Sequence, residues 1–270
     1  MIFRKVLHKI GIQRSYSKTV GTKKFKIPIY NKLGFANFST GEPWMDEVLQ
    51  NVGSKETKFL DIGANIGQTL MKWRGNFETA PYLGVEPNLQ CAAYVDFLIK
   101  TNNIKAAEII PVAVTDNTQF LDLYSSQTDP SDVCGTTVPN FREEQNQNGK
   151  KVVGLNYSLF RDYKPDIIKI DVEGAELNII RSIFEAKNET SPTILCEILP
   201  CYNDENISRI KAQDELITIL KKNQYCIFKI DTVNVKIKEI SKIRIHGDLT
   251  QCEYIFVHKE HKSNLISSFN

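Results

Sequence analysis

One ten-residue segment constrains the fold more than any other part of the sequence: residues 59–68, FLDIGANIGQ. The pattern is typical of a short buried strand that ends in an acid and is followed by a glycine turn and the first turn of a helix. In α/β sheets such a unit brings the chain to the carboxyl edge of the sheet, where glycines let the backbone approach a ligand. The unpaired N–H groups at the helix start point at the same place. The segment therefore predicts a nucleotide-like pocket.

The glycine spacing indicates which ligand that pocket takes. A dinucleotide site requires G-x-G-x-x-G, whereas this turn reads D-x-G-x-x-x-G and has Asn65 in the place of the middle glycine. The acid at the strand end, Asp61, suits a ligand that carries a positive charge and an ammonium group rather than phosphates. S-adenosylmethionine is the common ligand of this kind. The alternative for Asp61 alone is a helix N-cap, for which aspartate is a favoured residue.

A second apolar run, residues 82–88 with the sequence YLGVEPN, also ends in an acid and is followed by proline at a helix start. A carboxylate at this strand end, here Glu86, accepts hydrogen bonds from ribose hydroxyls in nucleoside-binding α/β folds. Taken alone, Glu86 is equally compatible with a solvated loop carboxylate. The two acids with a glycine turn between them favour a nucleoside site.

The third informative segment is 166–176, DIIKIDVEGAE. Alternation along a strand places Lys169, Asp171 and Glu173 on one side. A lysine in an otherwise apolar central strand requires a carboxylate partner. Asp171 and Glu173 are local candidates, and Asp61 is another if the two strands are neighbours.

Two interpretations of this cluster stay open. It is either a buried ion cluster that only organises the strand ends, or it places Asp171 and Glu173 beside the bound cofactor, where the acceptor arrives. Glu197, near the end of the following strand, could join them. A divalent cation between Asp171 and Glu197 would have the oxygen ligands it prefers. Without a clearer ligand set, and with no C-x-x-C pair or histidine cluster, we predict no metal site.

Strand-like and helical stretches alternate over most of the chain. The candidate strands are 58–62, 82–86, 108–114, 166–172, 193–199, 225–230 and 253–258, and the candidate helices are 66–75, 88–102, 174–187 and 205–222. This order predicts an α/β fold with a seven-stranded, mostly parallel sheet, helices on both faces, and a hairpin-like finish whose last strand is antiparallel. That is the architecture of the common methyltransferase fold.

Residues 117–163 interrupt the alternation with two strand-like pieces, 119–125 and 151–156, around a polar stretch. An insertion of this length is usually a lid, a binding loop or a mobile segment. We expect its part 126–150, including Gly135, Thr136 and Thr137, near the pocket mouth. Phe141 or Tyr157 could stack on a sugar there.

The remaining organisation follows from the same pattern. We expect a core domain over 51–260, a helical or extended extension over 1–50 that packs on or caps the core, and a tail over 261–270. Residues 1–10 show an amphipathic pattern, compatible with a weak membrane-surface anchor but favouring a short helix docked on the protein body.

Composition excludes several classes of protein. A net charge of +2 over 270 residues argues against a nucleic-acid binder. No apolar run is long enough to span a bilayer, and no secretion signal is evident. Cysteines placed in apolar segments fit a reducing cytoplasm.

Together the motifs DIGANIG, GVEPN and DIIKIDVEGAE, in this order, resemble the FkbM family of S-adenosylmethionine-dependent methyltransferases. The resemblance implies a class I, Rossmann-like methyltransferase that modifies hydroxyl oxygens, including those of sugars and polyketides. Residues implied to bind the cofactor are Asp61, Gly63, Ala64, Asn65 and Gly67 around the methionine end, Glu86, Pro87 and Asn88 around the ribose, Ala113 and Val114 beside the adenine, and Asp171.

Methyl transfer to oxygen requires alignment and a base for the hydroxyl proton. We expect Asp171 or Glu173 to be that base or to orient the hydroxyl, with Lys169 holding the carboxylates ionised. Two alternatives remain: a non-catalytic methyltransferase-like binding domain, and a nicotinamide-dependent oxidoreductase. The acceptor, a small molecule or glycan, and the oligomeric state are not encoded in any pattern we recognise.

Overall fold

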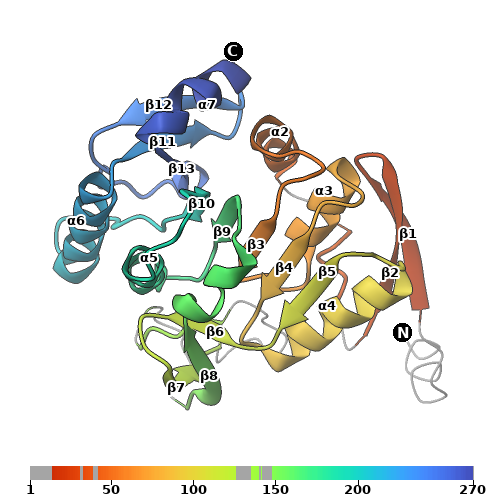
Figure 1. Cartoon of the computed structure of the whole chain (residues 1–270). Helices are drawn as coiled ribbons and strands as arrows, with labels where there is room; N and C mark the ends of the chain where they lie inside the picture. Colours follow the sequence, from red (N-terminus) through yellow and green to blue (C-terminus); the bar gives the residue numbers. More distant parts are fainter. Residues whose placement is uncertain are drawn as a thin grey trace.

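The computed structural model describes residues 14–30, 33–38, 42–125, 135–139, 141 and 148–269. Its centre is an eight-stranded sheet with the order β12-β11-β13-β10-β9-β3-β4-β5 (Figure 1). The strands are β3 (Phe59–Ile62), β4 (Tyr82–Val85), β5 (Ala107–Ile110), β9 (Ile167–Ile170), β10 (Thr193–Glu197), β11 (Tyr225–Asp231), β12 (Lys236–Ile240) and β13 (Glu253–His258). Neighbouring strands are parallel from β5 through β4, β3 and β9 to β10. The next strand, β13, pairs antiparallel with β10. The predicted fold class, including its antiparallel last strand, is therefore confirmed.

Two strand predictions need correction. The sheet has one strand more than the seven predicted, because β12 forms an edge hairpin with β11. The predicted strand 108–114 is two strands: β5 ends at Ile110, and β6 (Ala113–Thr115) belongs to a separate sheet. Pro111 lies between them, and its missing N–H cannot continue a sheet ladder.

Alternation along the strands divides the core into two faces. Phe59 and Ile167 point to one face and Leu60 and Ile168 to the other. The first face is covered by α2 (Pro43–Val52), α3 (Gln68–Asn76), α4 (Leu89–Thr101) and α7 (Lys262–Ser268), and the second by α5 (Glu176–Glu185) and α6 (Ile207–Lys222) (Figure 1). The four predicted helices agree with α3, α4, α5 and α6 to within two residues at each end. Each fully buried aliphatic side chain in these layers contributes about 1.5–3 kcal/mol.

The first described residues form a hairpin of β1 (Arg14–Val20) and β2 (Lys23–Ile29). Its Phe25 and Ile27 are buried in the same core cluster as α3. Gly75 of α3 allows the hairpin turn to approach, since an added Cβ there would lie 2.4 Å from the carbonyl oxygen of Val20. The amphipathic stretch expected over residues 1–10 lies outside the described part of the chain.

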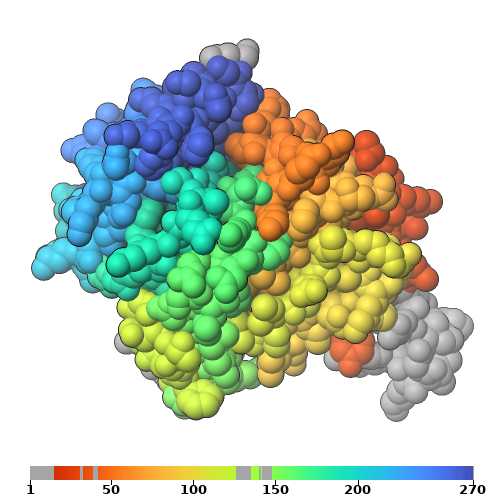
Figure 2. Space-filling view, in the orientation of Figure 1, coloured from red at the N-terminus to blue at the C-terminus, as the bar shows by residue number. Residues whose placement is uncertain are grey.

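At the other end, α7 packs beside α2 on the same face of the sheet (Figure 2). No helix among the described residues is long and apolar enough to cross a membrane.

A small three-stranded sheet lies beside the main one and joins β6 to β8 (Lys150–Asn156) and β7 (Gln119–Leu123) (Figure 1). The two strand-like pieces predicted in the insertion are thus strands. Much of 126–150 lies outside the described residues, but Thr136 pairs with Tyr124 and holds the described part of that segment against β7. Tyr157 is fully buried under α5, so the expectation that it stacks on a sugar is wrong.

Candidate active site

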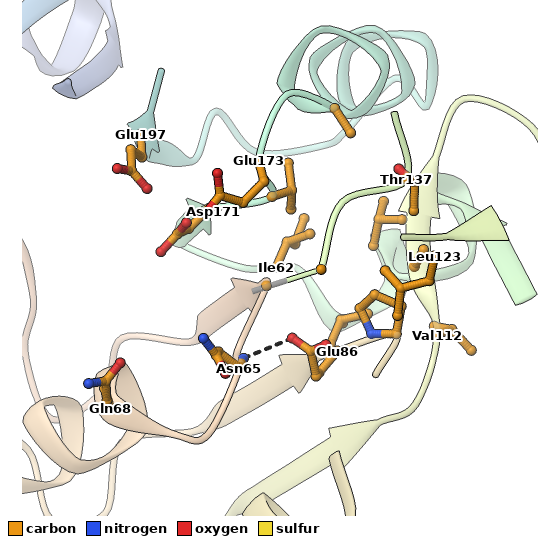
Figure 3. A pocket seen from close by; sticks show the side chains of 18 residues that line it. Ile62, Asn65, Gln68, Glu86, Val112, Leu123, Thr137, Asp171, Glu173 and Glu197 are labelled. Atoms are coloured by element: carbon orange, nitrogen blue, oxygen red, sulfur yellow. Dashed lines mark hydrogen bonds between the residues drawn. The ribbon is translucent and has the colours of Figure 1, made fainter. Parts of the chain in front are cut away.

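A cavity of about 240 Å³ opens where β3, β4, β9 and β10 end at the carboxyl edge of the sheet. The predicted site residues that line it are Gly63, Asn65, Glu86, Pro87, Ala113, Val114, Asp171 and Glu173. Three segments that are far apart in the sequence therefore meet in one pocket (Figure 3). Of the other predicted residues, Asp61, Ala64, Gly67, Asn88 and Lys169 do not line it and lie next to those that do.

The glycine turn fits between the ends of β4 and β9. The N–H groups of Gly63 and Ala64 donate to the carbonyl oxygen of Val85 at 2.9 and 3.1 Å. Gly63 has φ 89°, and an added Cβ there would lie 1.8 Å from the carbonyl oxygen of Asp171. Only glycine satisfies both the dihedral angle and the space. Gly67, at φ 81°, then precedes α3, at whose start no described side chain forms a cap.

Glu86 and Asn65 form one side of the pocket. The backbone N–H of Asn65 donates to one carboxylate oxygen of Glu86 at 2.9 Å (Figure 3), and the backbone N–H of Asn88 donates to the other at 2.7 Å. Burial raises the pKa of Glu86 to about 7, although both hydrogen bonds oppose the shift. Each carboxylate oxygen keeps a second lone pair for a ligand hydroxyl. The side-chain oxygen of Asn65 is buried and has no hydrogen-bond partner among the described residues.

Asp61 lies behind the glycine turn, fully buried in β3. The hydroxyl of Tyr82 donates to its Oδ2 at 2.5 Å, and its Oδ1 has no partner in the described structure. Burial raises the pKa of Asp61, against the effects of the nearby Lys169 charge and the Tyr82 hydrogen bond. The register of β3 with β9 sets Asp61 directly beside Lys169, as the sequence led us to expect.

Lys169 carries a buried positive charge in the middle of the sheet. Its side chain lies beneath Trp44 and Met45 of α2, and its Nζ donates to Asp171 Oδ2 at 2.8 Å. Burial alone would lower the pKa of Lys169, but the neighbouring carboxylates, chiefly Asp171 and then Asp61, hold it above its usual value. The carboxylate partner required by the sequence argument is therefore Asp171.

Asp171 and Glu197 form a hydrogen-bonded carboxyl pair at the pocket wall. Burial acts to raise the pKa of Asp171, but the charge of Lys169 and the hydrogen bonds from Glu197 and Lys169 hold it below its usual value. Burial and the negative charge of Asp171 raise the pKa of Glu197 to about 10. The charge of Lys169 therefore favours the ionised form of Asp171, and the negative charge of Asp171 favours the protonated form of Glu197.

Glu173 lies on the turn between β9 and α5 and also lines the pocket. It has φ 54° and the following Gly174 has φ 103°, so two consecutive residues adopt the left-handed conformation. The hydroxyl of Thr136 donates to the carbonyl oxygen of Glu173 at 2.7 Å and fixes this turn. Asp171, Glu173 and Glu197 lie together on the side of the pocket away from Val112 and Leu123 (Figure 3).

Several lining residues were not among the predicted site residues. Among them are Gln68 at the start of α3, Val112 before β6 and Leu123 of β7. Gly135 and Thr137 also line the pocket, in agreement with the expected position of the insertion. The sequence placed the insertion near the pocket mouth but gave no signal for Leu123. Among the described residues, no group of three or more His, Cys, Asp or Glu side chains is arranged to hold a metal ion.

The comparisons with known proteins agree with this geometry. Residues 61–227 match the model of the methyltransferase FkbM domain. The chain belongs to the FkbM methyltransferase family. It is therefore a methyltransferase, and its methyl donor is S-adenosylmethionine. No curated protein matches the chain.

The solved structures that match the chain do so at low sequence identity. A methyltransferase FkbM from Methylobacillus flagellatus KT is 18% identical to this chain, with a TM-score of 0.46. The match covers 76% of this chain and 44% of that one, so this chain spans less than half of the length of that protein. An O-methyltransferase from Bacillus cereus in complex with SAH is 14% identical over 83% of this chain and 86% of that one, with a TM-score of 0.43. A putative SAM-dependent methyltransferase from Streptococcus mutans is 8% identical over 90% and 54%, with a TM-score of 0.48.

Proposed function

We propose that this FkbM-family methyltransferase methylates a hydroxyl oxygen of a glycan or another small molecule, and that it acts in the cytoplasm. One observation carries the proposal: a single pocket combines a nucleoside-type acid, Glu86, with an ionised carboxylate, Asp171, on its other side. Family membership leaves the nicotinamide oxidoreductase alternative without support.

The residues around the glycine turn fit S-adenosylmethionine. Glu86 offers carboxylate lone pairs to two ribose hydroxyls, and the unpartnered side-chain oxygen of Asn65 offers an acceptor to an ammonium group. Ala113 and Val114 provide an apolar wall for a base. When bound, this donor supplies an electrophilic methyl group carried on a sulfonium.

On the acceptor side, we propose that Asp171 orients the hydroxyl and receives its proton. As the acceptor oxygen would form its bond to the methyl carbon, the carbon–sulfur bond of the donor would break and leave S-adenosylhomocysteine as a neutral thioether, while the hydroxyl proton would pass to an oxygen of Asp171. Lys169 positions Asp171 through the 2.8 Å ion pair and keeps it ionised, and Glu197 supports it by hydrogen bonding. Glu173 faces the same space and is the second candidate for this role.

Asp171→Asn and Glu173→Gln variants test the assignment. Loss of the base should lower turnover by roughly 10²–10⁴-fold, while the affinity for S-adenosylhomocysteine changes less than threefold. Turnover is followed as S-adenosylhomocysteine released from S-adenosylmethionine with a panel of sugar and polyketide alcohols. Near-normal turnover in both variants would remove both residues as bases. A protein that binds no S-adenosylhomocysteine would favour a non-catalytic binding domain instead.

A further inference from the structure

A second cavity, of about 290 Å³, lies between the first turns of α5 and α6. The turn after β9 separates it from the cofactor pocket: Glu173 and Ala175 line the first cavity, whereas Gly174 and Glu176 line the second. The insertion contributes to the same wall, with Thr137 facing the first cavity and Val138 and Pro139 facing the second. The two cavities are therefore adjacent chambers that share one backbone partition.

One face of α6 forms the floor of the second cavity. Four residues at the spacing of one helical face line the cavity: Arg209, Ala212, Gln213 and Leu216. Two of these side chains are held in place by backbone carbonyls after β10. Arg209 Nη1 donates to the oxygen of Pro200 at 2.8 Å, and Gln213 Nε2 donates to that of Leu199 at 3.1 Å.

The opposite wall carries a buried acid. Glu176 is only 8% exposed, and its Oε1 accepts a hydrogen bond from the N–H of Gly174 at 2.7 Å. Phe141 packs against Gly174, and the guanidinium of Arg209 lies 4.4 Å from the centre of its ring. Polar groups are thus fixed on two walls, and the space between them is lined by apolar side chains, among them Leu177 and Ile198.

We propose that this second cavity binds the part of the acceptor that is not methylated, and that its ligand is an uncharged, polyhydroxylated ring such as a sugar unit. The inference rests on the proposed function, which places methyl transfer in the first cavity, beside Asp171. Neither the family nor the cofactor requires a second chamber.

The chemistry of the lining selects this class of ligand. Arg209 and Gln213 bring donors and Glu176 brings acceptors, while the apolar side chains match the C–H surface of a ring. The lining holds one cation, Arg209, and one carboxyl group, Glu176, so it has no excess of either charge that would select a charged ligand. The volume corresponds to roughly ten water molecules at about 30 Å³ each, the scale of one six-membered sugar ring.

Saturation-transfer NMR on the full chain, saturated with S-adenosylhomocysteine, tests the proposal. The probes are the methyl glycosides of glucose, galactose, mannose and N-acetylglucosamine at millimolar concentration. At least one should receive saturation from the wild type. Ala212→Trp, which fills the cavity from α6, should reduce that signal at least fivefold, whereas Lys211→Trp, on the exposed face of the same helix, should retain it. If the tryptophan variant fails to fold, Ala212→Phe replaces it.

The outcomes separate the two proposals. No signal with any glycoside in the wild type, or a signal that survives filling the cavity, overturns the sugar subsite. If a hydroxyl is methylated equally well by Ala212→Trp and the wild type, the subsite is wrong and the proposed function stands. If sugars bind here but no hydroxyl acceptor is ever methylated, the proposed function fails and the cavity is a sugar site without a role in methyl transfer, which overturns its assignment to the acceptor. Both α6 variants should bind S-adenosylhomocysteine within twofold of the wild type.

Discussion

Replacing Lys169 by methionine should destabilise the protein in a way that depends on pH. The substitution keeps most of the side-chain volume beneath α2 and removes only the charge that Asp171 requires. Breaking a buried ion pair by removing one partner costs about 3–5 kcal/mol. Because 37% of the Asp171 side chain is exposed to the pocket and stays solvated, we expect the lower part of that range or slightly less, about 2–3 kcal/mol at pH 8.

The sign of the pH dependence follows from the two pKa shifts. Asp171 has a lowered pKa in the folded protein, so it contributes stability above its unfolded pKa and loses it as the pH falls through the folded value. Without Lys169, burial raises the pKa of Asp171 instead. The folded variant then takes up a proton more readily than the unfolded chain. The deficit relative to the wild type should therefore shrink as the pH falls from 8 towards 4.

Urea unfolding at several pH values measures this deficit. The matched double variant, Lys169→Met with Asp171→Asn, carries neither charge and should recover at least half of the lost free energy of unfolding at pH 8. A deficit that is the same at pH 8 and pH 4, with no recovery in the double variant, would mean that Lys169 contributes packing alone. The ion-pair account of the site would then be refuted.

Two further substitutions test residues of β4 and of the glycine turn. Gly63→Ala should lower the free energy of unfolding by about 2–4 kcal/mol, because its Cβ would collide with the carbonyl oxygen of Asp171. Gly247→Ala is the control and should be close to neutral in the same urea titration, because the atom nearest to its added Cβ lies 3.8 Å away. Tyr82→Phe leaves the buried Asp61 without its donor and should cost about 1–3 kcal/mol, a loss that a thermal melt would detect; an unchanged midpoint would show that water replaces the hydroxyl.

The sequence predicted the parts of the fold and site that depend on local pattern. The pattern in FLDI predicted a short buried strand, and Lys169 in an apolar strand required the carboxylate that Asp171 supplies. The glycine turn predicted a close approach of the backbone to a ligand, and the structure shows a second reason for glycine at position 63, the nearby carbonyl oxygen of Asp171. These features follow from the chemistry of a few consecutive residues.

The rest depends on contacts between distant segments. The raised pKa of Glu197 depends on how β10 lies beside β9. The register of β10 with β13 adds Glu253, whose pKa burial raises to about 8. No local pattern encodes these registers. The second cavity likewise exists only because α5 and α6 pack together, so the helical face that begins at Arg209 carried no recognisable signal.

Isothermal titration with S-adenosylhomocysteine tests the central claim most directly, because Glu86 is the acid assigned to the cofactor ribose. One molecule should bind per chain, and Glu86→Ala should weaken binding by roughly 10- to 100-fold, the equivalent of charge-assisted hydrogen bonds. Because burial raises the pKa of Glu86 to about 7, wild-type affinity should also increase from pH 6 to pH 8, and Glu86→Gln should abolish that increase. Glu108→Ala, an exposed carboxylate on neighbouring β5, serves as the control and should bind normally. Absence of binding to the wild type, or unchanged affinity in a folded Glu86→Ala protein, would contradict the account.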